Sequence, residues 1–290
     1  MSENLKKPDW LKVSYNKDAV NEVAKLMADL KLNTVCREAN CPNIGECCSK
    51  HTATFMIMGS NCTRNCRFCN VTCDKPTPLD IEEPENVAKA AKQLNLKHVV
   101  VTSVTRDDLP DGGAEHFAKV IRAIKDLCPD TTVEVLIPDL KGDEKALDTV
   151  LNANPDVLNH NVETVSELYS KVRPQAIYKR SLDVLRYCKK KRPDIKVKTG
   201  FMVGLGETDE QILKLMEDIY ETGCDILTIG QYLRPSKEHA ELKRYVTPEQ
   251  FAEYKKQAMK IGIKYVASTP LARSSYKAFE ALQATTTENE

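Results

Sequence analysis

Three cysteines that lie close together carry the clearest chemical signal in this sequence. Cys62, Cys66 and Cys69 follow the spacing C-x3-C-x2-C, directly after the short apolar run 54–59. A loop that follows a buried strand can bring three thiolates to one side of a metal centre. Structural zinc usually takes four protein ligands, whereas three thiolates without an obvious fourth suit an iron–sulfur cluster that keeps one open iron. Such an iron can bind a small molecule directly.

A second cysteine group lies upstream of the first. Cys36, Cys41 and Cys47 follow the spacing C-x4-C-x5-C, although Cys48 comes next and spacing alone also allows it as the third member. A helix that ends near Cys36 and a loop with the other two could bring three sulfurs to a second centre. For the C-x3-C-x2-C loop, the spacing alone leaves two alternatives, a zinc loop and reduced structural thiols.

Composition limits the classes of protein to which the chain can belong. It has 290 residues, with 42 Lys+Arg balanced by 42 Asp+Glu, which argues against a nucleic-acid partner. No stretch approaches the ~18 apolar residues of a membrane span, and the first residues lack a signal-peptide core. Eleven cysteines, an odd count, fit a reducing compartment better than a disulfide framework. We therefore expect a cytoplasmic protein with no membrane partner.

Short apolar runs alternate with helical patterns from residue 54 onward. The runs cover residues 54–59, 98–104, 133–138, 156–160, 197–203, 225–229 and 264–268. The β-branched stretch 99–101 is typical of a strand buried on both faces. Strand–helix repetition of this kind implies a parallel sheet with right-handed crossovers. Because about six units are present, we predict an α/β fold: a partial (β/α)6 barrel of the TIM type with N- and C-terminal extensions.

Helix-start signals support this alternation. Pro84 suits the first turn of a helix, and Thr208 with Gln211 forms a capping-box pattern. Thr247 repeats that signature, and residues 21–32 carry apolar side chains at helical spacing.

The expected organisation has three parts. Residues 1–50 form an N-terminal extension with the upstream cysteines, residues 51–262 form the partial barrel, and residues 263–290 form a C-terminal extension. Within these, residues 1–20 are expected to lie as a polar arm across the body, and residues 285–290 to be a disordered tail.

Chemistry in parallel barrels sits where the strands end at their carboxyl edge. The polar and glycine residues just past the predicted strands are therefore candidate ligand contacts, and they include Ser103, Asn159, Asn161, Glu163 and Gly204. For any one of them, a hydrogen-bonded turn is the alternative explanation. Arg173 is a candidate partner for a carboxylate or carbonyl, with a surface ion pair as its alternative.

A polar segment near the end of the sequence, Arg273-Ser274-Ser275-Tyr276, completes a family pattern. Together with the two cysteine groups it resembles the lipoyl synthase family of the radical S-adenosylmethionine (SAM) superfamily. Phe68, before the last cysteine of its group, also belongs to the superfamily pattern. Further similar stretches are residues 106–109, 111–113, 159–161, 172–174 and 200–207, so that the resemblance runs from about residue 8 to residue 276.

The resemblance implies two [4Fe–4S] clusters with different tasks. Cys62, Cys66 and Cys69 would hold the radical-generating cluster, whose open iron binds SAM. Cys36, Cys41 and Cys47 would hold an auxiliary cluster with a serine oxygen as fourth ligand, placed on Ser275 with Ser274 as the neighbouring choice. A hard alkoxide is mismatched to a soft cluster, so it can be released as the cluster is consumed. The expected SAM contacts are Ser103, Asn159, Asn161, Glu163, Arg173 and Gly204.

The implied reaction is sulfur insertion at C6 and then C8 of a protein-bound octanoyl-lysine, with a radical from SAM removing each hydrogen and the auxiliary cluster as sulfur donor. Implied partners are the octanoylated lipoyl domains of 2-oxoacid dehydrogenase E2 subunits, the glycine-cleavage H protein, a ferredoxin- or flavodoxin-type electron donor, and an iron–sulfur carrier that renews the cluster. Another sulfur-inserting radical SAM enzyme is one alternative, against which the upstream cysteine group argues. A zinc-stabilised binding protein is the other.

Overall fold

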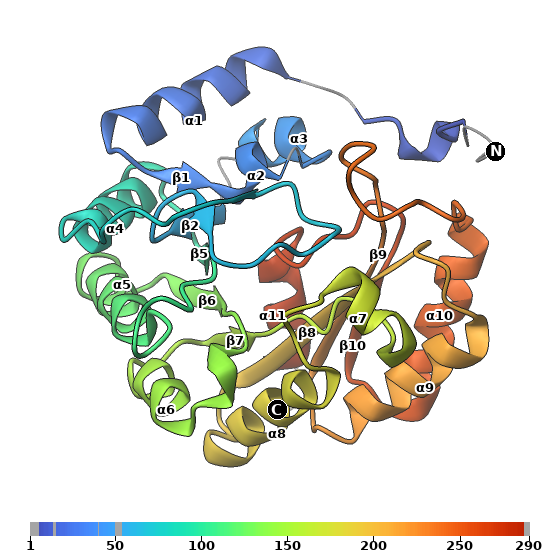
Figure 1. Cartoon of the computed structure of the whole chain (residues 1–290). Coiled ribbons are helices and arrows are strands. Elements are labelled where there is room, and N and C mark those ends of the chain that lie inside the picture. Colours follow the sequence, from blue (N-terminus) through green and yellow to red (C-terminus); the bar gives the residue numbers. More distant parts are fainter. Residues whose placement is uncertain (1–5, 14–15, 40, 50–53, 287–290) are drawn as a thin grey trace.

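A mostly parallel sheet, surrounded on its outside by helices, forms the body of the molecule (Figure 1). The computed structural model describes residues 6–13, 16–39, 41–49 and 54–286. The eight-stranded sheet has the order β1-β2-β5-β6-β7-β8-β9-β10. Its strands are β1 (Asn33–Thr34), β2 (Thr54–Ile57), β5 (His98–Ser103), β6 (Thr132–Leu136), β7 (Val157–Asn159), β8 (Lys196–Val203), β9 (Ile226–Gln231) and β10 (Tyr265–Ser268).

Strand β1 pairs antiparallel with β2, and every other neighbouring pair in this sheet is parallel. The predicted α/β architecture is therefore confirmed, and each of the apolar runs contains one strand. Six strand–helix units from β2 to α10 are followed by β10, which adds one more parallel strand at the edge. A separate two-stranded sheet joins β3 (Asn61–Cys62) to β4 (Thr72–Cys73).

The helices are α1 (Lys17–Asp29), α2 (Val35–Glu38), α3 (Ile44–Ser49), α4 (Glu83–Gln93), α5 (Ala114–Leu127), α6 (Glu144–Asn152), α7 (Tyr169–Val172), α8 (Tyr178–Lys191), α9 (Asp209–Tyr220), α10 (Pro248–Ile261) and α11 (Ala278–Thr286). The helices α4, α5, α6, α8, α9 and α10 follow the parallel strands in turn and form the outer arc in Figure 1. Three short 3-10 helices are Asp9–Leu11, Leu140–Gly142 and Ser166–Leu168. Helix α11 contacts β10 and β5 and lies inside the arc of outer helices (Figure 1).

The helix starts follow the signals in the sequence. Pro84 stands in the first turn of α4, and Thr208 and Gln211 form a complete capping box at α9. The Thr247 side chain accepts the amide hydrogen of Gln250 at the start of α10. Each device satisfies backbone groups that the helix itself leaves unpaired.

Two boundaries differ from the prediction. The first helix, expected over residues 21–32, begins at Lys17 and ends at Asp29, because residues 17–20 form its first turn and Lys31 adopts a left-handed φ of 54°. Part of the expected N-terminal arm is therefore helical. The expected disordered tail began at Thr285, but α11 continues to Thr286, where the Thr285 hydroxyl bonds the Ala281 carbonyl. Residues 287–290 lie outside the described residues.

The two faces of the central strands differ in chemistry. Alternate residues such as Val133, Val135 and Val197 join the apolar core between the sheet and the outer helices. On the opposite face, Lys198 Nζ lies 2.9 Å from Glu134 Oε1, although both side chains are fully buried. The sequence analysis did not foresee this buried ion pair.

Among the described residues, no helix combines the length and the apolar character needed to cross a membrane.

Candidate cluster-binding sites

The loop that carries Cys62, Cys66 and Cys69 follows β2, at the edge of the sheet where the parallel strands end. The Cys62 sulfur accepts hydrogen bonds from the backbone amides of Arg64 at 3.4 Å and Thr105 at 3.3 Å. Thr63 continues the attachment, since its amide donates to the Thr105 carbonyl at 3.0 Å. Thr105 follows β5, so the first cysteine is fixed to the end of the neighbouring strand.

Other segments hold the rest of this loop. The Arg67 amide donates to the Val172 carbonyl at 2.9 Å, and the Ala240 amide donates to the Arg67 carbonyl at 2.7 Å. His239 Nε2 donates to the Cys69 carbonyl at 3.0 Å. The loop is thus clamped by the end of α7 on one side and by the segment after β9 on the other.

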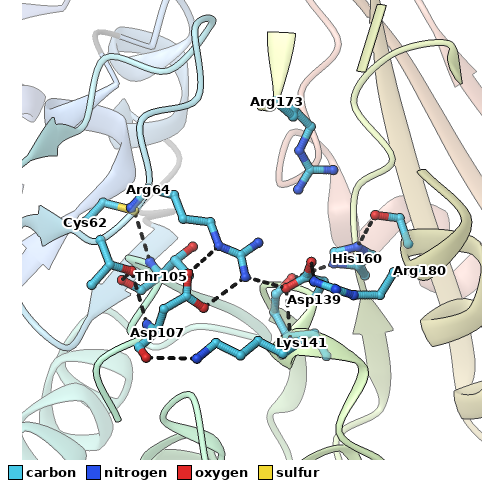
Figure 2. Close-up of polar contacts among 12 residues, drawn as sticks. Cys62, Arg64, Thr105, Asp107, Asp139, Lys141, His160, Arg173 and Arg180 are labelled. Atoms are coloured by element: carbon cyan, nitrogen blue, oxygen red, sulfur yellow. Dashed lines mark hydrogen bonds and ion pairs between the residues drawn. The ribbon is translucent and has the colours of Figure 1, made fainter. Parts of the chain in front are cut away.

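A buried guanidinium ties the middle of the loop to β6. Arg64 pairs with Asp107 at 2.6 Å and with Asp139 at 2.7 Å, and Figure 2 shows its side chain between these two carboxylates. Asp139 is fully buried, and although burial opposes its charge, Arg64 lowers the pKa of Asp139 to about 2. The two carboxylates likewise outweigh burial and raise the pKa of Arg64. The loop therefore cannot move without separating buried charges.

A chain of hydrogen bonds connects Arg173, beside the cysteines, to the interior. Arg173 donates to the Tyr169 hydroxyl at 2.9 Å, Tyr169 donates to Ser181 at 2.8 Å, and Ser181 lies 3.0 Å from His160 Nε2. His160 Nδ1 lies 2.9 Å from the Ile137 carbonyl, which can only accept, so Nδ1 carries the hydrogen and Nε2 accepts from Ser181. Burial, together with the charge of Arg173, lowers the pKa of His160 to about 4.

Burial disfavours ionisation of two of the thiols, those of Cys66 and Cys69. Burial raises the pKa of Cys66, which the nearby charge of Arg173 partly opposes. Burial also raises the pKa of Cys69 to about 12, and the neighbouring sulfurs of Cys66 and Cys62 add to this shift. Thiolates held this close need a positive centre to ionise together, as an iron–sulfur cluster provides.

Unpaired polar atoms mark the expected SAM contacts. Ser103 Oγ, Asn159 Oδ1 and Arg173 Nε are buried without a hydrogen-bond partner among the residues that the structure describes. Buried polar atoms normally have partners, so these three are open to a ligand. Glu163 adopts a left-handed φ of 72°, and burial raises its pKa while Arg173 opposes the shift.

The remaining two expected contacts have structural partners. Gly204 has a φ of 104°, and a Cβ atom there would come within 2.6 Å of the Arg244 carbonyl, so the chain needs glycine for close backbone approach. The Asn161 amide nitrogen lies 2.7 Å from the Ser274 hydroxyl. One expected SAM contact is therefore joined to the C-terminal segment.

The upstream cysteines and the C-terminal segment meet at a cavity of about 820 Å³. Cys36, on α2, Cys47, on α3, and Cys41 between the two helices all line it, as does Ser275. Ser274 is not among the lining residues, because its hydroxyl pairs with Asn161. The cavity thus brings together the residues expected to hold an auxiliary cluster.

Hydrogen bonds connect the two ends of the chain at this cavity. Asn43 Nδ2 donates to the Leu271 carbonyl at 2.8 Å, and the Tyr276 hydroxyl donates to Glu46 at 3.0 Å. Burial, then the bond to Glu46, raises the pKa of Tyr276 to about 12. Burial raises the pKa of Cys41, and the nearby charge of Arg273 opposes this shift.

The donor sets at both sites fit iron–sulfur clusters. Among the described residues, no three His, Cys, Asp or Glu side chains converge closely enough to hold one metal ion. A four-iron cluster is larger than an ion, and its ligands bind separate corners. Three thiols facing one cavity, or carried on one loop, are the donor arrangement that such clusters use.

Sequence reasoning missed the Arg64–Asp139 pair. The signal was a basic residue inside the cysteine motif and an aspartate just past a predicted strand, but their pairing spans 75 positions and depends on the tertiary fold.

Comparison with solved structures shows the same fold in proteins of low sequence identity. The maturase HydG of the [FeFe]-hydrogenase matches with a TM-score of 0.58 at 15% identity, over 95% of this chain and 61% of that one. Methylornithine synthase (PylB) matches with a TM-score of 0.52 at 14% identity, over 89% of this chain and 80% of that one.

Sequence comparison identifies the family. Residues 56–219 match the model of the Radical SAM superfamily. The lipoyl synthase of Caldanaerobacter subterraneus subsp. tengcongensis is 58% identical over 274 residues, covering 94% of this chain and 96% of the relative. That of Alkaliphilus metalliredigens is 53% identical over 282 residues, covering 97% of each. The chain therefore belongs to the lipoyl synthase family of the radical SAM superfamily.

Proposed function

We propose that this chain completes the lipoyl group on a carrier protein by inserting sulfur at C6 and C8 of an octanoyl-lysine side chain. As a member of its family it is a radical SAM sulfurtransferase, and membership implies an octanoylated protein substrate. The observation that carries the detailed proposal is the cavity shared by Cys36, Cys41, Cys47 and Ser275, in a chain that also has the C-x3-C-x2-C loop.

Membership in the superfamily implies one [4Fe–4S] cluster and SAM. We assign this cluster to Cys62, Cys66 and Cys69. When bound, the cluster and SAM supply an organic radical that removes hydrogen from an unactivated carbon. The protein's task is placement and exclusion of competing hydrogen donors. The clamped loop supports this assignment, because the backbone amides at Cys62 and the buried Arg64 fix the three sulfurs relative to the strand ends.

A second [4Fe–4S] cluster, the sulfur donor, is assigned to Cys36, Cys41, Cys47 and Ser275. Ser275 is preferred over Ser274 as the oxygen ligand because Ser275 lines the cavity. A serine oxygen is a poor match for a soft cluster, so this corner is the first that we expect to open.

The proposed SAM contacts differ in whether their polar atoms already have hydrogen-bond partners within the protein. Ser103, Asn159 and Arg173 have buried polar atoms open to a ligand, which supports direct contact. Asn161 and Glu163 lie just past β7 and complete the set. Gly204 is the weakest member, since close approach of the Arg244 backbone already requires a glycine there.

The individual partner proteins and the cellular location stay predictions. The expected partners are lipoyl domains of 2-oxoacid dehydrogenase E2 subunits, the glycine-cleavage H protein, a ferredoxin- or flavodoxin-type electron donor and an iron–sulfur carrier. The expected location is the cytoplasm. The division at residues 50 and 262 also stays a prediction; β1 and β10 lie outside the 51–262 part and form the two edges of its sheet.

The test is anaerobic incubation with an octanoylated lipoyl-domain peptide, SAM and a strong reductant, with the peptide mass followed over time. The native protein should add two sulfur atoms, Cys62→Ala should abolish SAM cleavage, and Cys41→Ala should cleave SAM without forming a sulfur-containing product. Cys128→Ala is the matched control, since Cys128 lies at the end of α5, outside both groups. Lipoyl formation by Cys41→Ala would refute the donor role.

A further inference from the structure

The segment between β10 and α11 passes directly over the neighbouring strand. The Gln231 amide at the end of β9 donates to the Pro270 carbonyl at 3.2 Å. At Gly230, a Cβ atom would lie 2.3 Å from the Ala272 carbonyl oxygen and 3.1 Å from an Arg273 guanidinium nitrogen. Side chains do not tolerate such approaches, so the segment can occupy this place only because β9 has a glycine there.

A second glycine makes room where the segment ends. At Gly200 on β8, a Cβ atom would lie 3.1 Å from the Asn161 side-chain oxygen. Asn161 Nδ2 lies 2.7 Å from Ser274 Oγ, and Ser274 Oγ lies 3.0 Å from Asn161 Oδ1. The two side chains come from positions 113 residues apart, and both are part-buried.

The next residue, Ser275, has a different environment from Ser274. It lines the cavity with Cys36, Cys41 and Cys47, while Ser274 is held by Asn161. The two adjacent serines therefore lie at different places: the Ser274 hydroxyl is bonded to Asn161 just past β7, and Ser275 lines the cavity that the three cysteines share.

We propose that Asn161 and Ser274 form a positioning pair that aims Ser275 at the auxiliary cysteines, and this inference rests on the proposed function. A serine on a loop samples many directions, and its oxygen binds a soft cluster weakly, so ligation depends on prior placement. Because Asn161 is also an expected SAM contact, the same amide joins the SAM side of the barrel to the auxiliary site. One hydrogen bond of this kind shifts an equilibrium about two- to tenfold.

The experiment measures which atoms ligate the auxiliary cluster, and not the enzyme's activity. The full chain carrying Cys62→Ala, Cys66→Ala and Cys69→Ala is loaded anaerobically with isotope-enriched iron and sulfide, so that only the upstream cysteines can hold a cluster. Mössbauer spectroscopy then gives the fraction of clusters in which one iron has an oxygen ligand. In this background Ser275→Ala should remove that signal. Ser274→Ala and Asn161→Ala should each lower the ratio of ligated to unligated clusters about two- to tenfold.

Two further variants separate positioning from loss of folding. Ser274→Thr keeps a hydroxyl and should retain most of the signal. Ser268, on neighbouring β10, has a buried hydroxyl that donates to the Phe251 carbonyl at 2.7 Å. Ser268→Ala removes this hydroxyl and should leave the signal unchanged. If Ser275→Ala removes the signal but Ser274→Ala and Asn161→Ala do not change it, the positioning pair is wrong and the ligand assignment stands. If Ser275→Ala also has no effect, the ligand assignment itself is wrong.

Discussion

The two cysteine groups are built into the molecule in different ways. The C-x3-C-x2-C loop is bonded to residues that follow β5, α7 and β9, and Arg64 fixes it to Asp139 past β6. The upstream group sits on two short helices, and its cavity is completed by a segment from the far end of the chain. A cluster that must survive each turnover suits the first site. A cluster that is taken apart and rebuilt would suit the second, where the proposed ligand Ser275 comes from a separate segment.

The two sites also differ in how deeply their polar pairs are buried. Arg64 and Asp139 are both buried, and separating them would leave an uncompensated charge inside the protein. Glu46 and Tyr276, at the auxiliary site, are only partly buried, and their bond can be exchanged for water at small cost. The structure thus predicts large losses from substitutions at the first site and small ones at the second.

The largest effect is expected for Arg64→Met. Asp139 would lose its nearest cation and keep the more distant Arg180, at 3.4 Å, and the Lys141 amide, at 3.1 Å. Losing one partner of a buried pair costs about 3–5 kcal/mol. We expect the free energy of unfolding in denaturant to fall by that order, and iron to be lost from the loop before the auxiliary site. Arg67→Met removes an exposed arginine from the same loop and is the matched control. Equal stability of the two variants would contradict the contrast between the sites.

A second prediction concerns acid and the hydrogen-bonded chain behind Arg173. The pKa of His160 is lowered from 6.5 to about 4 in the folded protein, so below pH 6.5 the unfolded chain binds a proton that the folded one excludes. The contribution of His160 to stability is therefore lost as pH falls from 6.5 toward 4, by about 3 kcal/mol over the window.

The measurement is the free energy of unfolding against pH for the native protein and for His160→Gln, under anaerobic conditions. The native curve should fall more steeply between pH 6.5 and pH 4, and the two curves should converge at the acid end. Asp139, with a pKa lowered from 3.8 to about 2, contributes its own loss only below this window. Parallel curves would show that His160 is not held neutral.

The smallest effect is expected at the auxiliary site. Tyr276→Phe removes the bond to Glu46 and should lower the free energy of unfolding by about 1 kcal/mol. The rate of iron loss to a chelator from the upstream cysteines should rise by a few-fold, with the loop cluster unaffected. Tyr265→Phe, on β10, is the matched control. A large loss of stability would mean that the chain ends hold the fold together rather than complete one site.

Local patterns were enough to predict the parallel strands of the main sheet and the starts of α4, α9 and α10. The β-branched stretch 99–101 and the Thr208–Gln211 capping box are decided by neighbours in sequence, so each could be recognised without the fold. The first helix begins earlier than predicted, because its first residues, Lys17 and Asp18, add no apolar side chain to the helical spacing.

Contacts between residues far apart in the sequence could not be predicted from local patterns. The buried Glu134–Lys198 pair lies on strands whose apolar neighbours dominate the pattern, and a buried charge has no signal of its own in the sequence. The choice between Ser274 and Ser275 was also open in the sequence. Our preference for Ser275 depends on Asn161 and on Gly230, which lie in other strand units. Only tertiary packing shows that Ser274 pairs with Asn161 while Ser275 lines the cavity.

The meeting of Asn43 with Leu271, and of Glu46 with Tyr276, has a consequence for synthesis on the ribosome. The residues that help to enclose the cavity beside Cys36, Cys41 and Cys47 are separated by 228 and 230 positions from their partners Asn43 and Glu46, and are translated that much later. The loop at 62–69 has its partners by the time residue 240 has emerged. A nascent chain can therefore gather the contacts of the 62–69 loop before residue 271 has emerged, whereas the cavity beside Cys36, Cys41 and Cys47 can be enclosed only after Tyr276 has emerged.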